Sequence, residues 1–317
     1  MGRTGRAMIE KSRIIDSFHQ FLDSDVWYSF KQSKVTMVAA VVTVIIMLAA
    51  LFAPAISLQN PFDPASLALL DAFNPPVWLE DGTWSFPLGS DDQGRDMYSA
   101  ILYGSRVSLL IGFAAVIFAM VLGVGLGLIA GYVGGTIDAV IMRIADVQIS
   151  FPAILIALLI DGVVRAVLPG ERHEEMVLYV LVLAIGLSQW VNFARTVRGS
   201  TMVERNKEYV QAARVIGVSA PAIMLRHILP NVMGPVLVIA TVSLAVAILL
   251  EATLSFLGVG VPPTEPSLGT LIRIGQDFLF SGEWWIVIFP GATLAVLVLA
   301  VNLLGDWLRD VFNPKLR

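Results

Sequence analysis

A chain of 317 residues can form a sizeable helix bundle, but it is too short for such a bundle together with a full nucleotide-binding domain. Hydrophobic residues make up 56% and charged residues 15% of the chain, whereas soluble domains show about 45–50% and about 25%, so a water-soluble fold is excluded. The net charge of -4 indicates no nucleic-acid partner, and the absence of cysteine excludes disulfides and cysteine-based metal sites.

Residues 1–34 form a basic N-terminal segment in which apolar residues recur at helical spacing. Two interpretations stay open for it: a helix on an anionic membrane surface, or a poorly ordered basic tail. The next run, Val35 to Ala53, is uncharged and long enough for a membrane span, which needs about 20 residues. We therefore predict the first transmembrane helix within residues 35–57.

Residues 58–106 form a proline-rich polar segment that is distinctly acidic. Two arginines, Arg95 and Arg106, stand among seven carboxylates: Asp63, Asp71, Glu80, Asp81, Asp91, Asp92 and Asp96. Since loops outside the cytoplasm are poor in Lys and Arg, we predict an extracytoplasmic loop here.

Glycines recur at four-residue spacing in and just after the second predicted span, Val107 to Ala130, at Gly123, Gly127 and Gly131. Glycines on one face of a membrane helix let another helix approach closely. The ladder therefore predicts a helix–helix seam.

The third predicted span, from about Ala139 to Ile160, carries Arg143 and Asp146 one helical turn apart near its start. A lone charge at mid-bilayer costs at least about 2.5–3.5 kcal/mol, so we expect the two to pair or to reach the interface. A proton relay is the alternative. Pro152 predicts a kink in this helix.

Three further spans are expected at Met176 to Ala194, about Gly234 to Leu257, and Trp284 to Leu304. Glu251 lies about 25 Å along the fifth span from its first end, so we place it near the opposite interface. It is a candidate for lining a solute route or for holding a helix end. The predicted fold is an all-α polytopic membrane bundle of six transmembrane helices, five of which form a core at residues 107–305.

The basic residues predict the orientation of the bundle. Fifteen of the 21 Lys and Arg lie in the N-terminal segment, in the stretch 195–233 and in the tail 306–317, whereas five lie in the loops on the other side. By the positive-inside tendency both termini and the stretch 195–233 are cytoplasmic.

The chain lacks the motifs that would give it an energy source or a catalytic site. It has no Gly-Lys dipeptide and therefore no phosphate-binding P-loop, and neither HExxH nor GxSxG occurs. Three hypotheses remain: a transport subunit driven by a partner, a secondary transporter or channel, and an intramembrane enzyme. An ion relay in the second would use Arg143, Asp146, Asp161 or Glu251.

The stretch 195–233 contains a predicted short helix from Glu208 to Gly217, with an acid at its start and a glycine where the chain can turn. Its apolar ridge consists of Tyr209, Ala212, Ala213 and Ile216. The spacing alone leaves two interpretations open: docking in a groove of a partner, or resting on lipid headgroups.

This loop resembles a motif of the permeases of binding-protein-dependent ABC importers, in which Glu-Ala-Ala is followed after three residues by Gly and after nine more by Ile-x-Leu-Pro. Gln211-Ala212-Ala213, Gly217 and Leu229-Pro230 occur at that spacing. Gln211 replaces the family's Glu, and His227 replaces its Ile.

Further stretches resemble the dipeptide/oligopeptide/nickel permease subfamily, and within it the second, shorter-looped subunit type. The match extends over nearly the whole chain beyond residue 35, and the stretches that carry it are Gly89-Ser-Asp-Asp-Gln-Gly-Arg-Asp96, Gly131-Tyr-Val-Gly-Gly, Glu251-Ala-Thr-Leu-Ser-Phe-Leu-Gly258, Pro262-Pro263, Asn302-Leu-Leu-Gly-Asp306 and Asn313-Pro-Lys-Leu-Arg317.

The resemblance implies a multi-pass subunit of the bacterial inner membrane that pairs with a homologous permease. Two ABC ATPase subunits would bind ATP and Mg, an extracytoplasmic binding protein would deliver the solute, and this chain would bind no cofactor or metal. Carried onto this chain, the coupling residues are Glu208, Tyr209, Gln211, Ala212, Ala213, Gly217, Leu229 and Pro230. Whether the solute is a dipeptide, an oligopeptide or a nickel chelate stays open.

Overall fold

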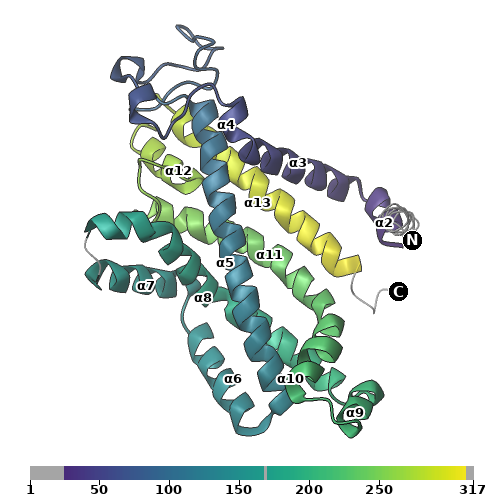
Figure 1. Cartoon of the computed structure of the whole chain (residues 1–317). Coiled ribbons are helices and arrows are strands. Elements are labelled where there is room, and N and C mark those ends of the chain that lie inside the picture. The colour runs from purple at the N-terminus through teal and green to yellow at the C-terminus, as the bar shows by residue number, and fades with distance from the viewer. Residues whose placement is uncertain (1–24, 168–169, 312–317) are drawn as a thin grey trace, which may run out of the picture.

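The computed structural model, which describes residues 25–167 and 170–311, is a bundle of long helices (Figure 1). Within these ranges there is no β-strand beyond an isolated bridge between Ser90 and Asp96. Five helices are long and apolar enough to cross a membrane, and a bent helix pair makes a sixth span if it is counted as one. The predicted all-α bundle is confirmed, and the predicted number of six spans holds when the bent pair is counted in this way.

The described chain begins with α2 (Asp25–Gln32), α3 (Lys34–Leu51) and the short α4 (Ala53–Ile56). Ser33 separates α2 from α3 and caps α3, because its Oγ accepts a hydrogen bond of 3.2 Å from the backbone N–H of Thr36. Residues 1–24 of the basic N-terminal segment and residues 312–317 of the tail lie outside the described residues.

The acidic loop contains two 3₁₀ turns, Pro64–Ser66 and Leu69–Asp71, and it ends where α5 (Met97–Val133) begins. This helix starts ten residues before the apolar run because Asp96 caps it, accepting a hydrogen bond of 2.8 Å from the N–H of Ser99. With 37 residues, α5 is about 55 Å long. The apolar run therefore marked only the part of this helix that suits a bilayer core.

The expected third span is broken into α6 (Gly135–Ile149) and α7 (Ala153–Val167), whose axes differ by 94°. The prediction of one kinked helix from Ala139 to Ile160 is wrong in this respect. Pro152 lacks a backbone N–H, and its ring disfavours the helical conformation of the residue before it. The proline therefore ends one helix and begins another.

The stretch 195–233 is mostly helical. It comprises the end of α8 (Gly170–Glu204), then α9 (Glu208–Val215), α10 (Ala220–Ile223), a π-helical turn (Met224–Ile228) and the start of α11 (Leu229–Phe256). Its polar residues thus extend two long helices beyond their apolar segments and flank one short helix.

A helix that the sequence analysis missed, α12 (Leu268–Gln276), lies between α11 and α13 (Trp285–Val311). It packs by its glycines: a Cβ on Gly269 would lie 2.4 Å from the carbonyl oxygen of Ala252, and one on Gly275 would lie 2.6 Å from the backbone of Ile286. The proline-rich connection before α13 is therefore a packed helix in part.

The helices give the bundle two distinct ends (Figure 1). The acidic loop, α4 and α12 lie at one end, and α5, α11 and α13 connect this end to the opposite one, which carries α2, α9, α10 and the last turns of α13. Near the termini Phe30 of α2 packs edge-on against Trp307 of α13, with 5.3 Å between ring centroids. The two ends of the described chain therefore lie together.

Candidate functional site

The short helix α9 is closed by a Schellman motif. The N–H of Val218 donates to the carbonyl of Ala213 at 3.0 Å, and the N–H of Gly217 donates to that of Arg214 at 3.0 Å. This cap requires a left-handed residue, and Gly217 has φ +82°. Apart from the neighbouring residues in the chain, no atom of the described residues lies within 4 Å of a Cβ added to Gly217, so its backbone angle, and not crowding, calls for glycine.

One face of α9 is buried and the other is exposed. Val210 and Ala213 face the bundle with 0% and 4% exposure, whereas Val215 and Ile216 are 87% and 79% exposed. The predicted apolar ridge is therefore divided between the two faces, with Ala213 directed inward. The exposed face consists of Glu208, Gln211, Ala212, Val215 and Ile216.

Tyr209 joins α9 to the end of α8 and to the start of α11. Its hydroxyl donates to Glu204 Oε2 at 2.5 Å and accepts from Asn231 Nδ2 at 3.1 Å, and Asn231 also donates to the carbonyl of His227 at 2.6 Å. Partial burial, together with the Glu204 carboxylate, raises the pKa of Tyr209 to about 12. The phenol therefore stays protonated and able to donate at neutral pH.

A second contact joins α9 to the end of α5. The Arg214 guanidinium lies 4.9 Å from the centre of the Tyr132 ring, and its Nε donates to the Tyr132 hydroxyl at 3.3 Å. Arg205, just after α8, donates to the carbonyls of Gly131 and Tyr132 at 2.9 and 3.3 Å. We call α9 with Tyr132, Glu204, Arg205 and Asn231 the α9 junction, because it ties one short helix to the ends of three long ones.

The glycine ladder of α5 packs against α8 with direct backbone contact, which confirms the predicted seam. A Cβ added to Gly123, Gly127 or Gly131 would lie 2.4, 2.6 or 2.7 Å from a carbonyl oxygen of α8. Separations this short leave no room for a side chain. The two helices are therefore interlocked from the middle of the bundle down to the α9 junction.

The charges of α6 bind α8, and not each other. Arg198 donates two hydrogen bonds to the Asp138 carboxylate at 2.5 and 2.6 Å, and Arg195 Nη2 lies 2.6 Å from Asp146 Oδ1. The expected pair of Arg143 with Asp146 does not form, and Arg143 is exposed with no ion pair among the described residues. Helical spacing permitted that pair, but α8 supplies a different arginine to Asp146.

Glu251 is fully buried where α5, α11 and α12 meet. Its carboxylate accepts hydrogen bonds of 2.7 Å from both Ser108 Oγ and Ser255 Oγ, and Ser108 Oγ also accepts from the N–H of Leu268 at 3.3 Å. With 0% exposure, this side chain has no contact with solvent in this structure. The geometry favours the interpretation that it holds a helix end.

The acidic loop is anchored to the bundle through the stretch Gly89–Asp96. Trp285 Nε1 donates to the carbonyl of Ser90 at 3.0 Å, and the buried Asp91 accepts from the backbone N–H of Gln93 and of Arg95 at 2.9 Å each. Burial raises the pKa of Asp91 against the opposing effect of these bonds and of the Arg95 charge. The stretch that resembles the subfamily is thus a fixed element of the loop end.

Two grooves lie along the helices. The first, of about 580 Å³, has a polar wall from α8 and a mainly apolar wall from α11, with Ala153 and Arg309 at its edges. The α8 wall consists of Ser188, Gln189, Asn192, Arg195 and Thr196, and the α11 wall consists of Val238, Ile239, Val242, Ser243, Val246 and Leu250. We call this the α8/α11 groove.

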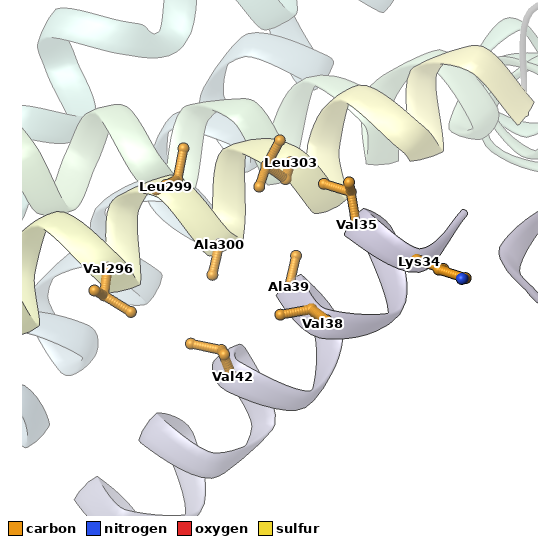
Figure 2. Close-up of a pocket in the computed structure, with 9 residues that line it drawn as sticks. All are labelled: Lys34, Val35, Val38, Ala39, Val42, Val296, Leu299, Ala300 and Leu303. Atoms are coloured by element: carbon orange, nitrogen blue, oxygen red, sulfur yellow. The ribbon is translucent and has the colours of Figure 1, made fainter.

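The second groove, of about 400 Å³, lies between α3 and α13 (Figure 2). Apart from Lys34 at one end, valines, leucines and alanines line it, so it offers a polar solute almost no hydrogen-bonding partner. Among the described residues, moreover, no cluster of His, Asp and Glu is placed to hold a metal ion. The α8/α11 groove is therefore the one with the chemistry to bind a polar molecule.

Comparison with known proteins matches two family models to this chain. Residues 123–317 match the model of the binding-protein-dependent transport system inner membrane component, and residues 22–76 match the N-terminal transmembrane domain of oligopeptide transport permease C. The chain belongs to the inner membrane components of binding-protein-dependent transport systems. The predicted family is thereby confirmed.

Several relatives within this permease family are similar over nearly their whole length. The di/tripeptide transport system permease protein DppC of Pseudomonas aeruginosa is 37% identical over 92% of this chain and 91% of that protein. The oligopeptide permease OppC of Bacillus subtilis is 36% identical over 92% of this chain and 90% of that protein. DppC of Escherichia coli is 39% identical over 92% of each chain. The predicted subfamily and subunit type are confirmed.

Solved structures of the MetNI methionine ABC transporter in inward-facing conformations show the same permease fold. One crystal form superposes with a TM-score of 0.52 at 16% identity and covers 68% of this chain and 96% of the MetNI chain. A second crystal form superposes with a TM-score of 0.53 at 18% identity and covers 68% of this chain and 98% of the MetNI chain. The chain is thus a multi-pass membrane permease of the ABC importer type. Its family is one of transport components.

Proposed function

We propose that this permease carries short peptides across the bacterial inner membrane, together with a homologous permease that completes the path. The relatives named above are di/tripeptide, dipeptide and oligopeptide permeases, and they match both the core and the N-terminal region. A solute-binding protein would deliver the peptide at the end that carries the acidic loop. The α9 end would then be cytoplasmic, as the distribution of basic residues predicts.

The proposed energy source is a pair of ABC ATPases that bind ATP and Mg, with α9 seated in a groove of one of them. The observation that carries this proposal is the two-sided construction of α9. Its exposed face, from Glu208 through Ala212 to Val215, is free for a partner, while its other side is tied to α5, α8 and α11. A force on the exposed face is therefore passed to three long helices at once.

The eight coupling residues take different roles in this proposal. Glu208, Gln211 and Ala212 contact the ATPase, while Tyr209 and Ala213 hold α9 to the bundle, and Gly217 closes the helix. Leu229 and Pro230 begin α11 beside the α9 junction. ATP-driven closure of the ATPases would move this junction and favour one of two packings of the bundle, by differential contacts with the two states.

The residues that the sequence marks as candidates for the pathway or for gating also have roles in this proposal. We assign Glu251 to holding α5, α11 and α12 together, and Asp146 to holding Arg195 at the edge of the α8/α11 groove. Arg143, which is exposed on α6, is assigned no part in transport. Glu251 and Asp146 have separate partners, and Arg143 has no ion pair among the described residues, so we propose no ion relay among these three side chains.

A substitution on the exposed face of α9 tests the proposal. Ala212→Trp adds bulk at an exposed position, so the permease should insert normally, while copurification of the ATPase and ATP-driven peptide uptake into proteoliposomes should both be lost. Val121→Trp, on an exposed apolar face of α5, is the matched control and should keep both. Full uptake by the Ala212 variant would contradict the proposal.

A further inference from the structure

The α8/α11 groove places a polar wall in the middle of a membrane-crossing helix. Its α8 residues run from Ser188 to Thr196, halfway along the spanning segment Met176–Glu204. Polar side chains are expensive at this depth, and where they face a cavity they mark a solute route more often than a structural contact. The groove's volume, about 580 Å³, is in the range of small-molecule sites.

Gln189 is the residue in this wall whose side-chain amide nitrogen lacks a hydrogen-bond partner within the described residues. It is 4% exposed. A buried polar group without a partner costs about 1–3 kcal/mol, so an acceptor entering the groove beside it would recover that free energy. The carbonyl oxygen of a peptide bond is an acceptor of this kind.

The charges at one end of the groove complement the terminal carboxylate of a peptide. Arg195 is already paired with Asp146, whereas Arg309 of α13 has no ion pair among the described residues and is exposed. The net charge of these three side chains is therefore positive. The facing α11 wall is mainly apolar, which accepts peptide side chains of different shapes without selecting among them.

We propose that the α8/α11 groove is a binding station for a short peptide in transit. Gln189 donates a hydrogen bond to a peptide carbonyl, Asn192 takes the neighbouring amide group, and Arg309 binds the carboxyl-terminal carboxylate. This proposal rests on the proposed function, and it adds a site within the membrane to whatever selection the external binding protein makes.

Gln189→Leu tests the station with little risk to the fold. Leucine is close in size to glutamine, and removing a buried amide that lacks a partner should leave the stability of the permease unchanged or raise it. In proteoliposomes that contain the complete transporter, we expect the KM for uptake of a labelled tripeptide to rise about tenfold, as for the loss of one buried hydrogen bond. The affinity of the binding protein for the tripeptide should not change.

Arg309→Gln tests the carboxylate contact separately. The transporter with Arg309→Gln should take up the free tripeptide less well than the wild type does. It should take up the same tripeptide with an amidated carboxyl terminus as well as the wild type does. Thr293→Val is the matched control, since it also removes a polar group from a membrane helix. The Thr293 hydroxyl bonds within its own helix, to the carbonyl of Phe289 at 2.9 Å, and does not line the groove.

Three results separate this inference from the proposal on which it rests. A raised KM in the Gln189 variant, with stability and ATPase binding preserved, supports the station. If wild-type vesicles take up the peptides and both variants match the wild type, the station is wrong while the proposed function stands. If wild-type vesicles take up no peptide at all, the proposed function is wrong, and the proposed peptide-binding site is wrong as well.

Discussion

The hydroxyl of Tyr209 lies 2.5 Å from the carboxylate of Glu204, so the first turn of α9 is bonded to the last turn of α8. The same hydroxyl accepts from Asn231 at the start of α11. One phenol thus connects three helices, and of these only α9 is short enough to move as a unit relative to the other two.

We expect Tyr209→Phe to weaken the coupling of ATP hydrolysis to transport. The ring that packs in the junction remains, but the bonds to Glu204 and Asn231 are lost, and a bond to a charged group is worth about 1.5–3 kcal/mol. The number of peptides imported per ATP hydrolysed should fall, while the ATPase still copurifies. Tyr179→Phe is the control because Tyr179 is 67% exposed on α8. An unchanged ratio would show that the phenol does not transmit the motion.

The Tyr209 phenol also predicts a pH response. Its pKa in the fold, about 12, is above the ordinary value of 10, so the folded state holds this proton more tightly than the unfolded state. The stabilisation is fully present below pH 10 and is lost as the pH rises through about 12. Thermal unfolding should therefore show no step from this group between pH 6 and 9. A change in melting temperature between pH 6 and 9 that is absent in Tyr209→Phe would contradict the raised pKa of Tyr209.

Gly217→Ala should loosen the end of α9 without a steric clash. The φ of +82° costs a residue with a Cβ about 1 kcal/mol, whereas nothing lies within 4 Å of the added atom. We expect a small loss of thermal stability and a partial loss of uptake. Gly217→Asn should be milder because Asn tolerates this conformation. Equal and severe losses in both variants would indicate a direct contact with the partner instead.

Two glycines of α5 give a matched pair for the seam with α8. Gly127→Ala places a Cβ 2.6 Å from the carbonyl oxygen of Ala194, and such overpacking costs about 1–3 kcal/mol. Gly125→Ala meets nothing within 4 Å and should be neutral or slightly stabilising, because alanine favours helix. Thermal unfolding of the purified transporter in detergent should separate the two. Equal melting temperatures would contradict the close packing described here.

Glu251 should matter for stability and not for proton movement. Glu251→Ala leaves the buried hydroxyls of Ser108 and Ser255 without their acceptor, at about 1–3 kcal/mol for each unsatisfied group, so less folded permease should be recovered. Glu251→Gln keeps an acceptor and cannot ionise. It should retain most of the ATP-driven uptake. Complete loss of uptake in a stable glutamine variant would favour a relay instead.

Apolar runs predicted five of the long helices because each span must satisfy its backbone internally in lipid. The limits of these helices could not be predicted in the same way. The start of α5 depends on a cap at Asp96, and α12 is short enough to be taken for a loop. The Ser267 cap before α12 and the apolar residues at helical spacing that follow were the signals that could have revealed it.

The candidate site was predicted in its position along the chain but not in its contacts. Spacing located α9 and its closing glycine, since both are local features. The pairing of Asp146 with Arg195 and of Tyr209 with Glu204 depends on how distant helices meet, and on the bend at Pro152 in the first case. Neither the α8/α11 groove nor the inward position of Ala213 could be predicted without the tertiary arrangement.

In the proposed mechanism the exposed face of α9 touches an ATPase and follows its motion. The chain has no cysteine, so Val215→Cys introduces a single reactive thiol at an 87% exposed position, and Val121→Cys on α5 provides a control at 66% exposure. A short bifunctional maleimide should cross-link position 215, and not 121, to a cysteine in the ATPase, with a yield that changes when ATP is added. The absence of cross-linking at 215 in a transporter that still imports peptide, or a yield indifferent to ATP, would contradict the account.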